Sequence, residues 1–424
     1  MHTLGEPPEM SDANIVSKLA TVGYFSDVER IVCPTIGFPS VLTHGSILTV
    51  DMCAPHGKST SGQSWHVSLC RGIRRVGVGR ETTIDDGTYY FESIALRVEN
   101  VGYFDDFSYR LSARIPDDIQ VDLYDLSVEV GGKLFTQENA VQIVQSFPSQ
   151  PRFCILSDPH VGFKGYPCID APNVDEMSLF RNAIKDINES RPDFVIITGD
   201  LVDWSSMKNW KDLRNLLKTF QVPTYTTIGN HDYYWDNWWD GYPPLLPASV
   251  RCDPVAIRYY LRHINPHTNY SFDYGPIHAV CLDSGDDAVL AAVEAYGSGL
   301  TDDDLAWLEN DLQGKEGSLV FMHHPATRAG AEDELKRRAN AGCITVNRTE
   351  FMDLCAKHHV AAVFSGHEHK DEYWHQDGVD YYTSPSVSRS GENNGYRSVQ
   401  ITVEGTFHTG VVTVSSQTRE YHSL

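Results

Sequence analysis

The apolar run Phe153-Cys154-Ile155-Leu156 leads directly into Ser157-Asp158-Pro159-His160, and the same succession recurs four more times along the chain. Each apolar run predicts a buried strand, and the polar side chains that follow it are potential metal ligands. Because open α/β folds place their sites at the carboxyl ends of strands, the pattern predicts an α/β fold with one site at these ends. The clusters are Asp158 and His160; Asp200 in Gly199-Asp200-Leu201-Val202-Asp203; Asn230 in Gly229-Asn230-His231-Asp232; His323 in Val320-Phe321-Met322-His323-His324; and His367 and His369 in Gly366-His367-Glu368-His369.

The seven candidate ligands are histidines, carboxylates and one amide, without a cysteine. This donor set suits hard or borderline divalent ions such as Mn, Fe or Zn. Seven ligands exceed one tetrahedral site but suffice for two ions that share a bridging carboxylate. Two adjacent metal ions are a common apparatus for the hydrolysis of phosphate esters.

The ordered clusters resemble the signature of the calcineurin-like metallophosphoesterases, D-x-H, G-D-x-x, G-N-H-[DE], H and G-H-x-H. The resemblance covers roughly residues 151–415 and implies an αββα sandwich of two mixed sheets with two divalent metal ions. It implies that Asp200 bridges the two ions. It further implies that Asp158, Asp200, His160 and His369 hold the first ion, and that Asp200, Asn230, His323 and His367 hold the second.

The same resemblance implies a hydroxide bridging the ions as the nucleophile and His231 as the acid that protonates the leaving group. Asp203 and Asp232 are the expected partners that orient His231, since an imidazole works best when its second nitrogen is held. His324 is expected to support the site or to face the substrate.

Six aromatic residues follow the third cluster between residues 233 and 242. A lid or wall that packs on a substrate would explain them, and Tyr233 and Trp235 are the candidate contact residues. A hydrophobic hinge under a long loop explains them equally well.

Residues 1–150 have a different pattern from residues 151–424. Short runs of alternating apolar residues predict strands over 46–52, 64–70, 89–99, 107–115 and 124–130. Strands at this spacing predict a β-sandwich, and many metallophosphoesterases carry an immunoglobulin-like domain ahead of the catalytic one. We therefore expect a β-rich accessory domain over 1–150 and the catalytic domain over 151–424.

The catalytic region alternates predicted strands with predicted helices. Helical spacing of apolar residues predicts helices over 174–190 and 210–220. Thr301, with Asp304 three residues later, predicts the capped start of a third helix whose inner face carries Leu305, Leu308 and Leu312.

A formal net charge of −23 argues against a nucleic-acid polymer as the partner, because phosphate backbones require many Lys and Arg residues. A small phosphate ester is still compatible, since bound metals reverse the local field. No leader or apolar span of about 18 residues is visible, and nine scattered cysteines suggest reduced thiols. These features predict a cytoplasmic protein with no membrane partner; a homo-oligomer is possible.

The motif details favour one branch of the family. Purple acid phosphatases have Tyr at the position of Asp203, so we exclude that branch. Asp203, Gly229-Asn230-His231-Asp232 and His323-His324-Pro325 resemble the class III cyclic nucleotide and glycerophosphodiester phosphodiesterases, although Ala326 replaces a second Pro of that group. We expect a phosphodiesterase; the alternatives are a phosphomonoesterase and an inactive binding module, which would usually have lost a ligand.

Overall fold

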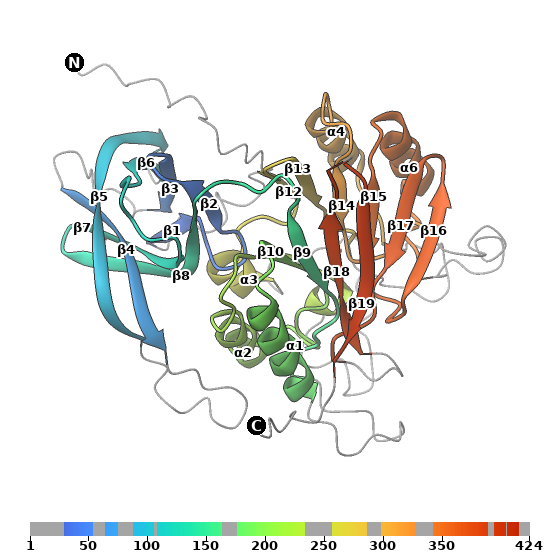
Figure 1. Cartoon of the computed structure of the whole chain (residues 1–424), viewed down its shortest axis with the longest axis horizontal. Helices are drawn as coiled ribbons and strands as arrows, with labels where there is room; N and C mark the ends of the chain where they lie inside the picture. The colour runs from blue at the N-terminus through green and yellow to red at the C-terminus, as the bar shows by residue number, and fades with distance from the viewer. Residues whose placement is uncertain are drawn as a thin grey trace.

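The computed structural model describes residues 29–53, 64–74, 88–105, 108–162, 176–233, 257–285, 298–327, 342–388, 394–403 and 405–414. Three sheets organise these residues (Figure 1). One is formed before residue 145, and the other two are formed after residue 151. The boundary that the sequence predicts near residue 150 lies between the last strand of the first sheet and the first strand of the others.

The first of the two sheets after residue 151 has five strands in the order β11-β10-β9-β18-β19. The three strands β9, β10 and β11 are parallel, whereas β18 and β19 are antiparallel additions at one side. The strands are β9 (Arg152–Leu156), β10 (Phe194–Thr198), β11 (Thr224–Thr227), β18 (Gly395–Ile401) and β19 (Phe407–Thr413).

The second of these sheets has six strands in the order β12-β13-β14-β15-β17-β16. Its four central strands are parallel, and an antiparallel strand completes each edge. The strands are β12 (Tyr270–Tyr274), β13 (Ile277–Cys281), β14 (Leu319–Phe321), β15 (Ala362–Ser365), β16 (Glu372–Gln376) and β17 (Val379–Thr383).

The central strands of both sheets are covered on both faces, which explains why they are nearly continuous apolar runs. Successive residues of a strand face opposite sides, so Phe153 and Ile155 pack in the core between the sheets. Cys154 and Leu156 of the same strand pack on the helix side. The outer layers are α1 (Glu176–Ser190), α2 (Met207–Leu217) and α3 (Arg258–His263) on one side, and α4 (Asp302–Asp311) and α6 (Arg348–Lys357) on the other (Figure 1).

This arrangement confirms the expected αββα sandwich of two mixed sheets. The predicted helices over 174–190 and 210–220 correspond to α1 and α2, with shifts of a few residues at their ends. Thr301 and Asp304 form the predicted capping box of α4, in which each side chain bonds the other residue's backbone N–H. Leu308 and Leu312 are buried beneath α4, and Leu305 packs partly against the same core.

The sheet before residue 145 has eight strands in the order β1-β3-β6-β5-β4-β7-β8-β2. The long strand β5 pairs with β4 through its first half and with β6 through its second half. Buried side chains from both halves of the sheet form one core. The strands are β1 (Arg30–Cys33), β2 (Ser40–Thr43), β3 (Ile47–Cys53), β4 (Trp65–Arg74), β5 (Thr88–Asp105), β6 (Ser108–Arg114), β7 (Leu123–Val130) and β8 (Lys133–Val144).

All five strands expected in this region are present, and the region is β-rich as predicted. The strands β1, β2 and β8 were not predicted. Gly131 and Gly132, both with positive φ, form the tight turn between β7 and β8. The immunoglobulin-like assignment stays a prediction.

The segment between β1 and β2 joins this sheet to the region after residue 151. The Gly37 N–H donates to Ile264 O at 2.8 Å, and the Thr226 N–H donates to Gly37 O at 3.1 Å. A Cβ on Gly37 would lie 2.7 Å from Thr226 Oγ1, so only glycine fits this approach. Ile36 belongs to the core beneath α1 and α2, and Phe38 belongs to the core between the sheets. The N-terminal region thereby covers the outer edge of β11.

A second junction lies at the end of α2. Glu138 of β8 pairs with Arg214 at 2.5 Å and with Lys218 at 3.2 Å. The Asn139 side-chain amide donates to Phe220 O at 3.0 Å. A cavity of about 640 Å³ adjoins this junction, and none of the candidate metal ligands lines it.

No helix among the described residues is long and apolar enough to cross a membrane. Cys154, Cys281 and Cys355 are buried thiols, as expected from the cysteine pattern.

His278 forms a buried charge cluster between β12, β13 and α4. Its Nδ1 lies 2.5 Å from Asp273 Oδ1, and its Nε2 lies 3.0 Å from Asp311 Oδ2. Burial opposes the charged imidazole, but the hydrogen bonds to Asp273 and Asp311 outweigh burial and raise the pKa of His278 above its usual 6.5. An imidazolium donates from both nitrogens, which suits two carboxylate partners.

We predict that the stabilisation due to His278 decreases at alkaline pH. Because its folded-state pKa is raised, this stabilisation is complete below about pH 6.5 and is lost as the pH rises through the folded-state value. His278→Gln should lower the free energy of unfolding by about 1.5–3 kcal/mol at pH 6, and by less at pH 9. Urea unfolding of both proteins across this range measures the difference. The control is His375→Gln at an exposed histidine; a difference that does not vary with pH contradicts the prediction.

Candidate metal centre

The seven candidate ligands follow the carboxyl ends of parallel strands in the two sheets after residue 151. Asp158 and Asp200 follow β9 and β10, and Asn230 begins the single 3-10 turn (Asn230–Tyr233) after β11. His323 follows β14, and His367 follows β15 of the facing sheet. Parallel strands end at the same edge of a sheet, so residues from distant parts of the sequence meet there.

Four of these residues form one compact group. Asp158, His160, Asp200 and His369 each place a potential ligand atom within 4.8 Å of the others. His369 Nε2 lies 3.1 Å from Asp158 Oδ1 and 3.3 Å from His160 Nε2. Carboxylate and imidazole atoms therefore converge on one point, and they are the residues expected to hold the first ion.

The remaining candidates converge beside this group. Asn230 Oδ1 lies 2.9 Å from His323 Nε2 and 3.2 Å from His367 Nδ1. Asp200 lies between the two groups, with Oδ1 3.3 Å from His323 Nε2 and Oδ2 3.5 Å from His160 Nε2. Each oxygen of one carboxylate thus faces a different set of ligands.

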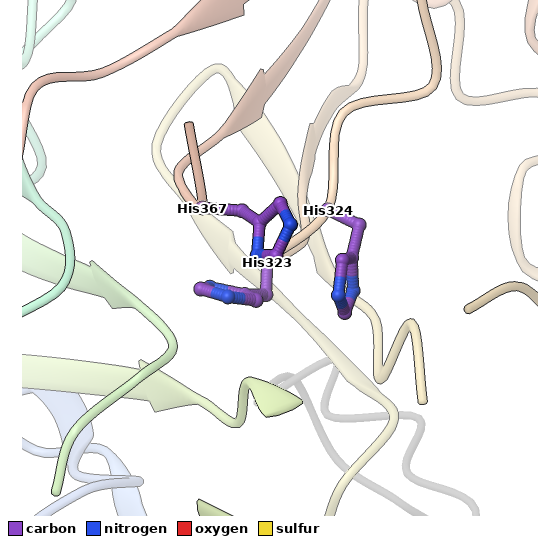
Figure 2. Close-up of side chains that lie close together, drawn as sticks. All are labelled: His323, His324 and His367. Carbon is purple, nitrogen blue, oxygen red and sulfur yellow. The ribbon is translucent and has the colours of Figure 1, made fainter. Parts of the chain in front are cut away.

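His324 lies next to this second group, as Figure 2 shows for His323, His324 and His367. The His324 ring is 4.4 Å from the His367 ring, and its Nδ1 lies 2.8 Å from Ser284 Oγ. Burial, together with His367 and His323, holds the pKa of His324 well below its usual value. His324 is therefore a neutral, buried imidazole beside the ligand set, and it offers a ring nitrogen within 4.8 Å of those of His323 and His367. Ser284 is a site residue that the sequence analysis missed.

Asp203 connects His231 to the ligand set. The His231 Nδ1 lies 2.9 Å from the backbone oxygen of Asp203 and 3.5 Å from its Oδ1. The same Oδ1 lies 3.3 Å from His160 Nδ1. Burial opposes the charged form of His231, but Asp200 and Asp203 outweigh it and raise the pKa of His231 to about 9.

The expectation that Asp232 also orients His231 is wrong. The Asp232 carboxylate is fully buried and accepts hydrogen bonds from the backbone N–H groups of Gly229, Leu201 and Val202. Asp232 therefore connects the loop after β10 to the loop after β11. Adjacency in sequence did not reveal this direction, because residues 230–233 form a 3-10 turn that points consecutive side chains to different sides.

Tyr233 and Trp235 were predicted to contact substrate. Tyr233 is buried in the helix-side core, and its hydroxyl donates to Asp283 Oδ2 at 2.5 Å. Trp235 lies outside the described residues. The Trp204 ring, which directly follows Asp203 in sequence, lies 5.8 Å from the His231 ring and was not predicted as a site residue.

The backbone at the site adopts an unusual conformation. Asp158, His160, Asp200, His367 and His369 all have φ between 40° and 68°. Non-glycine residues seldom adopt this left-handed region, and such strain persists only where the surrounding structure enforces it. The sequence indicated tight turns only through the neighbouring glycines.

Those glycines have different roles. Gly199 has φ 83°, which supplies the expected turn after β10. Gly229 instead allows a close approach, because a Cβ there would lie 2.5 Å from Asp200 Oδ1 and 2.8 Å from His323 Cδ2.

The donor set fits divalent metal ions. Hydrogen bonds and charge from neighbouring histidines overcome burial and hold the pKa values of Asp158 and Asp200 well below the usual range, so both are carboxylates. Burial lowers the pKa of His160 to about 4 and that of His367 to about 3, which leaves neutral imidazoles with a lone pair to offer. Burial opposes a charge on His323, but Asp200 outweighs burial and raises the pKa of His323 to about 10. A bound metal cation would replace the proton that His323 otherwise carries.

A family model for calcineurin-like phosphoesterases matches residues 151–371, more than half of the chain. The chain belongs to this family. Curated relatives are named phosphodiesterases, and this chain is a metal-dependent hydrolase of phosphate esters.

Curated relatives include a probable glycerophosphodiester phosphodiesterase from Arcobacter nitrofigilis, 28% identical over 54% of this chain and 77% of the relative. A 3′,5′-cyclic-nucleotide phosphodiesterase from a Nostoc species is 24% identical over 55% of this chain and 81% of the relative. A serine/threonine-protein phosphatase from Danio rerio is 24% identical over 59% of this chain and 75% of the relative.

Gly229→Ala should weaken metal binding, because the added methyl group would displace Asp200 or His323. We expect the affinity for Mn²⁺ to fall by about 10–100-fold, the range seen when groups that orient metal ligands are disturbed. The control is Gly410→Ala, since a Cβ at Gly410 meets nothing within 4 Å. Titration calorimetry of metal-free protein measures the affinity, and equal binding by both variants would show that the close approach at Gly229 is unimportant.

Proposed function

We propose that the chain is a phosphodiesterase that uses two divalent metal ions to hydrolyse a small phosphodiester. Asp158, His160, Asp200 and His369 would hold one ion, and Asp200, Asn230, His323 and His367 would hold the other. The observation that carries the proposal is the position of Asp200, whose two carboxylate oxygens face different ligand groups. When bound, the ions would activate water as the nucleophile and neutralise charge on the phosphoryl oxygens.

The protein itself would supply the proton for the leaving group through His231. Its side chain is 13% exposed, so it borders the space next to the ligand set. Asp203 and its backbone oxygen face Nδ1, and Nε2 would be the atom that donates the proton. The contact between Asp203 and His160 would hold His231 at a fixed position relative to the ligand set.

The phosphodiester preference is supported by the relatives named as phosphodiesterases and by Asp203 at the position where purple acid phosphatases have Tyr. The relative named as a protein phosphatase supports the alternative, a phosphomonoesterase. An inactive binding module is disfavoured because all seven ligand positions are occupied by side chains able to bind metal. We also propose that the chain has two domains, over residues 1–150 and 151–424. The proposed substrate is a small molecule.

The central experiment compares a chromogenic phosphodiester with the matching monoester, using metal-stripped protein restored with Mn²⁺. We expect faster hydrolysis of the diester and loss of both metal and activity in Asp200→Asn, because the amide cannot bridge two cations as a carboxylate does. The control is Asp303→Asn at an exposed carboxylate on α4. Faster hydrolysis of the monoester would establish the alternative, and full activity of Asp200→Asn would refute the metal assignment.

If His231 protonates the leaving group, the loss of rate in His231→Gln should depend on which leaving group the substrate carries. In His231→Gln, hydrolysis of an alkyl phosphodiester should slow by about 10²–10⁴-fold, because an alkoxide needs a proton to leave. A nitrophenyl diester should slow much less, since nitrophenolate leaves without protonation. Steady-state kinetics of both substrates, beside His408→Gln at an exposed histidine, measure the contrast. An equal loss for both substrates would assign His231 to phosphate binding instead.

A further inference from the structure

The turn Asp158-Pro159-His160 has a strained backbone. Asp158 has φ 54° and His160 has φ 40°, both in the left-handed region. Proline fixes its own φ and restricts the residue before it to extended conformations, which adds to the strain at Asp158. Because the turn is buried, its backbone N–H and carbonyl groups need hydrogen-bond partners.

The N–H groups of the turn are bonded by the neighbouring ligand loop. The Asp158 N–H donates to Gly199 O at 3.2 Å, and the His160 N–H donates to Asp200 O at 2.9 Å. Pro159 has no N–H to satisfy. One side of the turn is therefore held by the loop after β10.

The carbonyl groups of the turn are bonded by two serines from the far end of the chain. Ser386 Oγ donates to Asp158 O at 2.9 Å. Ser388 Oγ donates to Pro159 O at 2.6 Å and lies 3.3 Å from Asp158 O. Both serines are 1% exposed, so water does not compete for these bonds.

The serine segment is itself attached on both sides. The Val387 N–H donates to Ser157 O at 2.9 Å, and the Ser384 N–H donates to Ser365 O at 2.8 Å. Ser365 ends β15, the strand that leads to His367. The segment therefore connects the turn that follows β9 with the strand that leads to the facing ligand loop.

We infer that Ser386 and Ser388 are positioning residues that hold the Asp158-Pro159-His160 turn in its left-handed shape. Each hydroxyl acts through the backbone to which Asp158 and His160 belong. This inference rests on the proposed function, in which Asp158 and His160 bind one metal ion. Removing the Ser388 hydroxyl would take away the bond to Pro159 O, and removing the Ser386 hydroxyl would leave Asp158 O with only the longer contact to Ser388. Either change would loosen the turn.

Ser384 offers a matched control within the same segment. It is 0% exposed, and within the described residues its hydroxyl has no hydrogen-bond partner. Ser384→Ala therefore removes the same atom from the same buried segment without touching the turn.

The test is the binding of Mn²⁺ to metal-free protein, measured by titration calorimetry for Ser386→Ala, Ser388→Ala, Ser384→Ala and Asp158→Asn. We expect Ser386→Ala and Ser388→Ala each to weaken one of two binding events by about 10–100-fold and to leave the other near the wild-type affinity. Ser384→Ala should bind as the wild type does. Urea unfolding of the metal-free variants separates lost affinity from lost stability, and Ser386→Cys and Ser388→Cys provide milder changes should an alanine variant not fold.

The outcomes separate this inference from the proposed function. Wild-type binding by Ser386→Ala and Ser388→Ala, with weakened binding in Asp158→Asn, would overturn the positioning role alone. Equal weakening in Ser384→Ala would also overturn it, since the whole segment would then act as general support. Wild-type binding in Asp158→Asn would refute the ligand assignment on which the inference depends.

Discussion

The carboxylate of Asp200 is the constraint on which the site depends. It is 2% exposed, and removing a carboxylate from water costs several kcal/mol unless cations or hydrogen-bond donors compensate it. The structure surrounds it with His160 on one oxygen and His323 on the other, and the backbone N–H of His231 donates to its Oδ1 at 2.9 Å. Two divalent ions would balance the same negative charge more fully. The buried charge of Asp200 therefore explains both the surrounding histidines and the proposed binding of two metal ions.

The two-sheet architecture brings these groups together. Each ligand loop follows a strand whose alternate residues are buried in different cores, so the strand end has little freedom to move. The strained loops are then linked to each other: Asp232 joins the loops after β10 and β11, and the serine segment joins the turn after β9 to the end of β15. Because each loop is bonded to another, the site behaves as one connected unit rather than as seven independent side chains.

The N-terminal region is part of this support. Gly37 occupies the outer edge of β11, the strand that leads to Asn230 and His231, and Phe38 packs among Tyr225 and Tyr270 in the core between the sheets. An uncovered edge strand would expose unpaired backbone groups, and here the segment between β1 and β2 covers it. Through Gly37 and Phe38, the N-terminal region therefore packs on the catalytic region and supports its shape.

The sequence alone determined which residues could form the site and where strands would end, because ligand chemistry and buried apolar runs are local properties. Asp158, Asp200 and Asn230 stand directly after such runs, and Thr301 and Asp304 cap a helix as their spacing predicts.

Tertiary structure alone decided which polar groups meet. Asp232 bonds backbone instead of His231, His324 meets Ser284, and Ser386 and Ser388 reach a turn more than two hundred residues earlier. Such contacts depend on strand order and on left-handed φ values at Asp158 and His160, which no local pattern specifies, since the energy that enforces them comes from packing between distant segments.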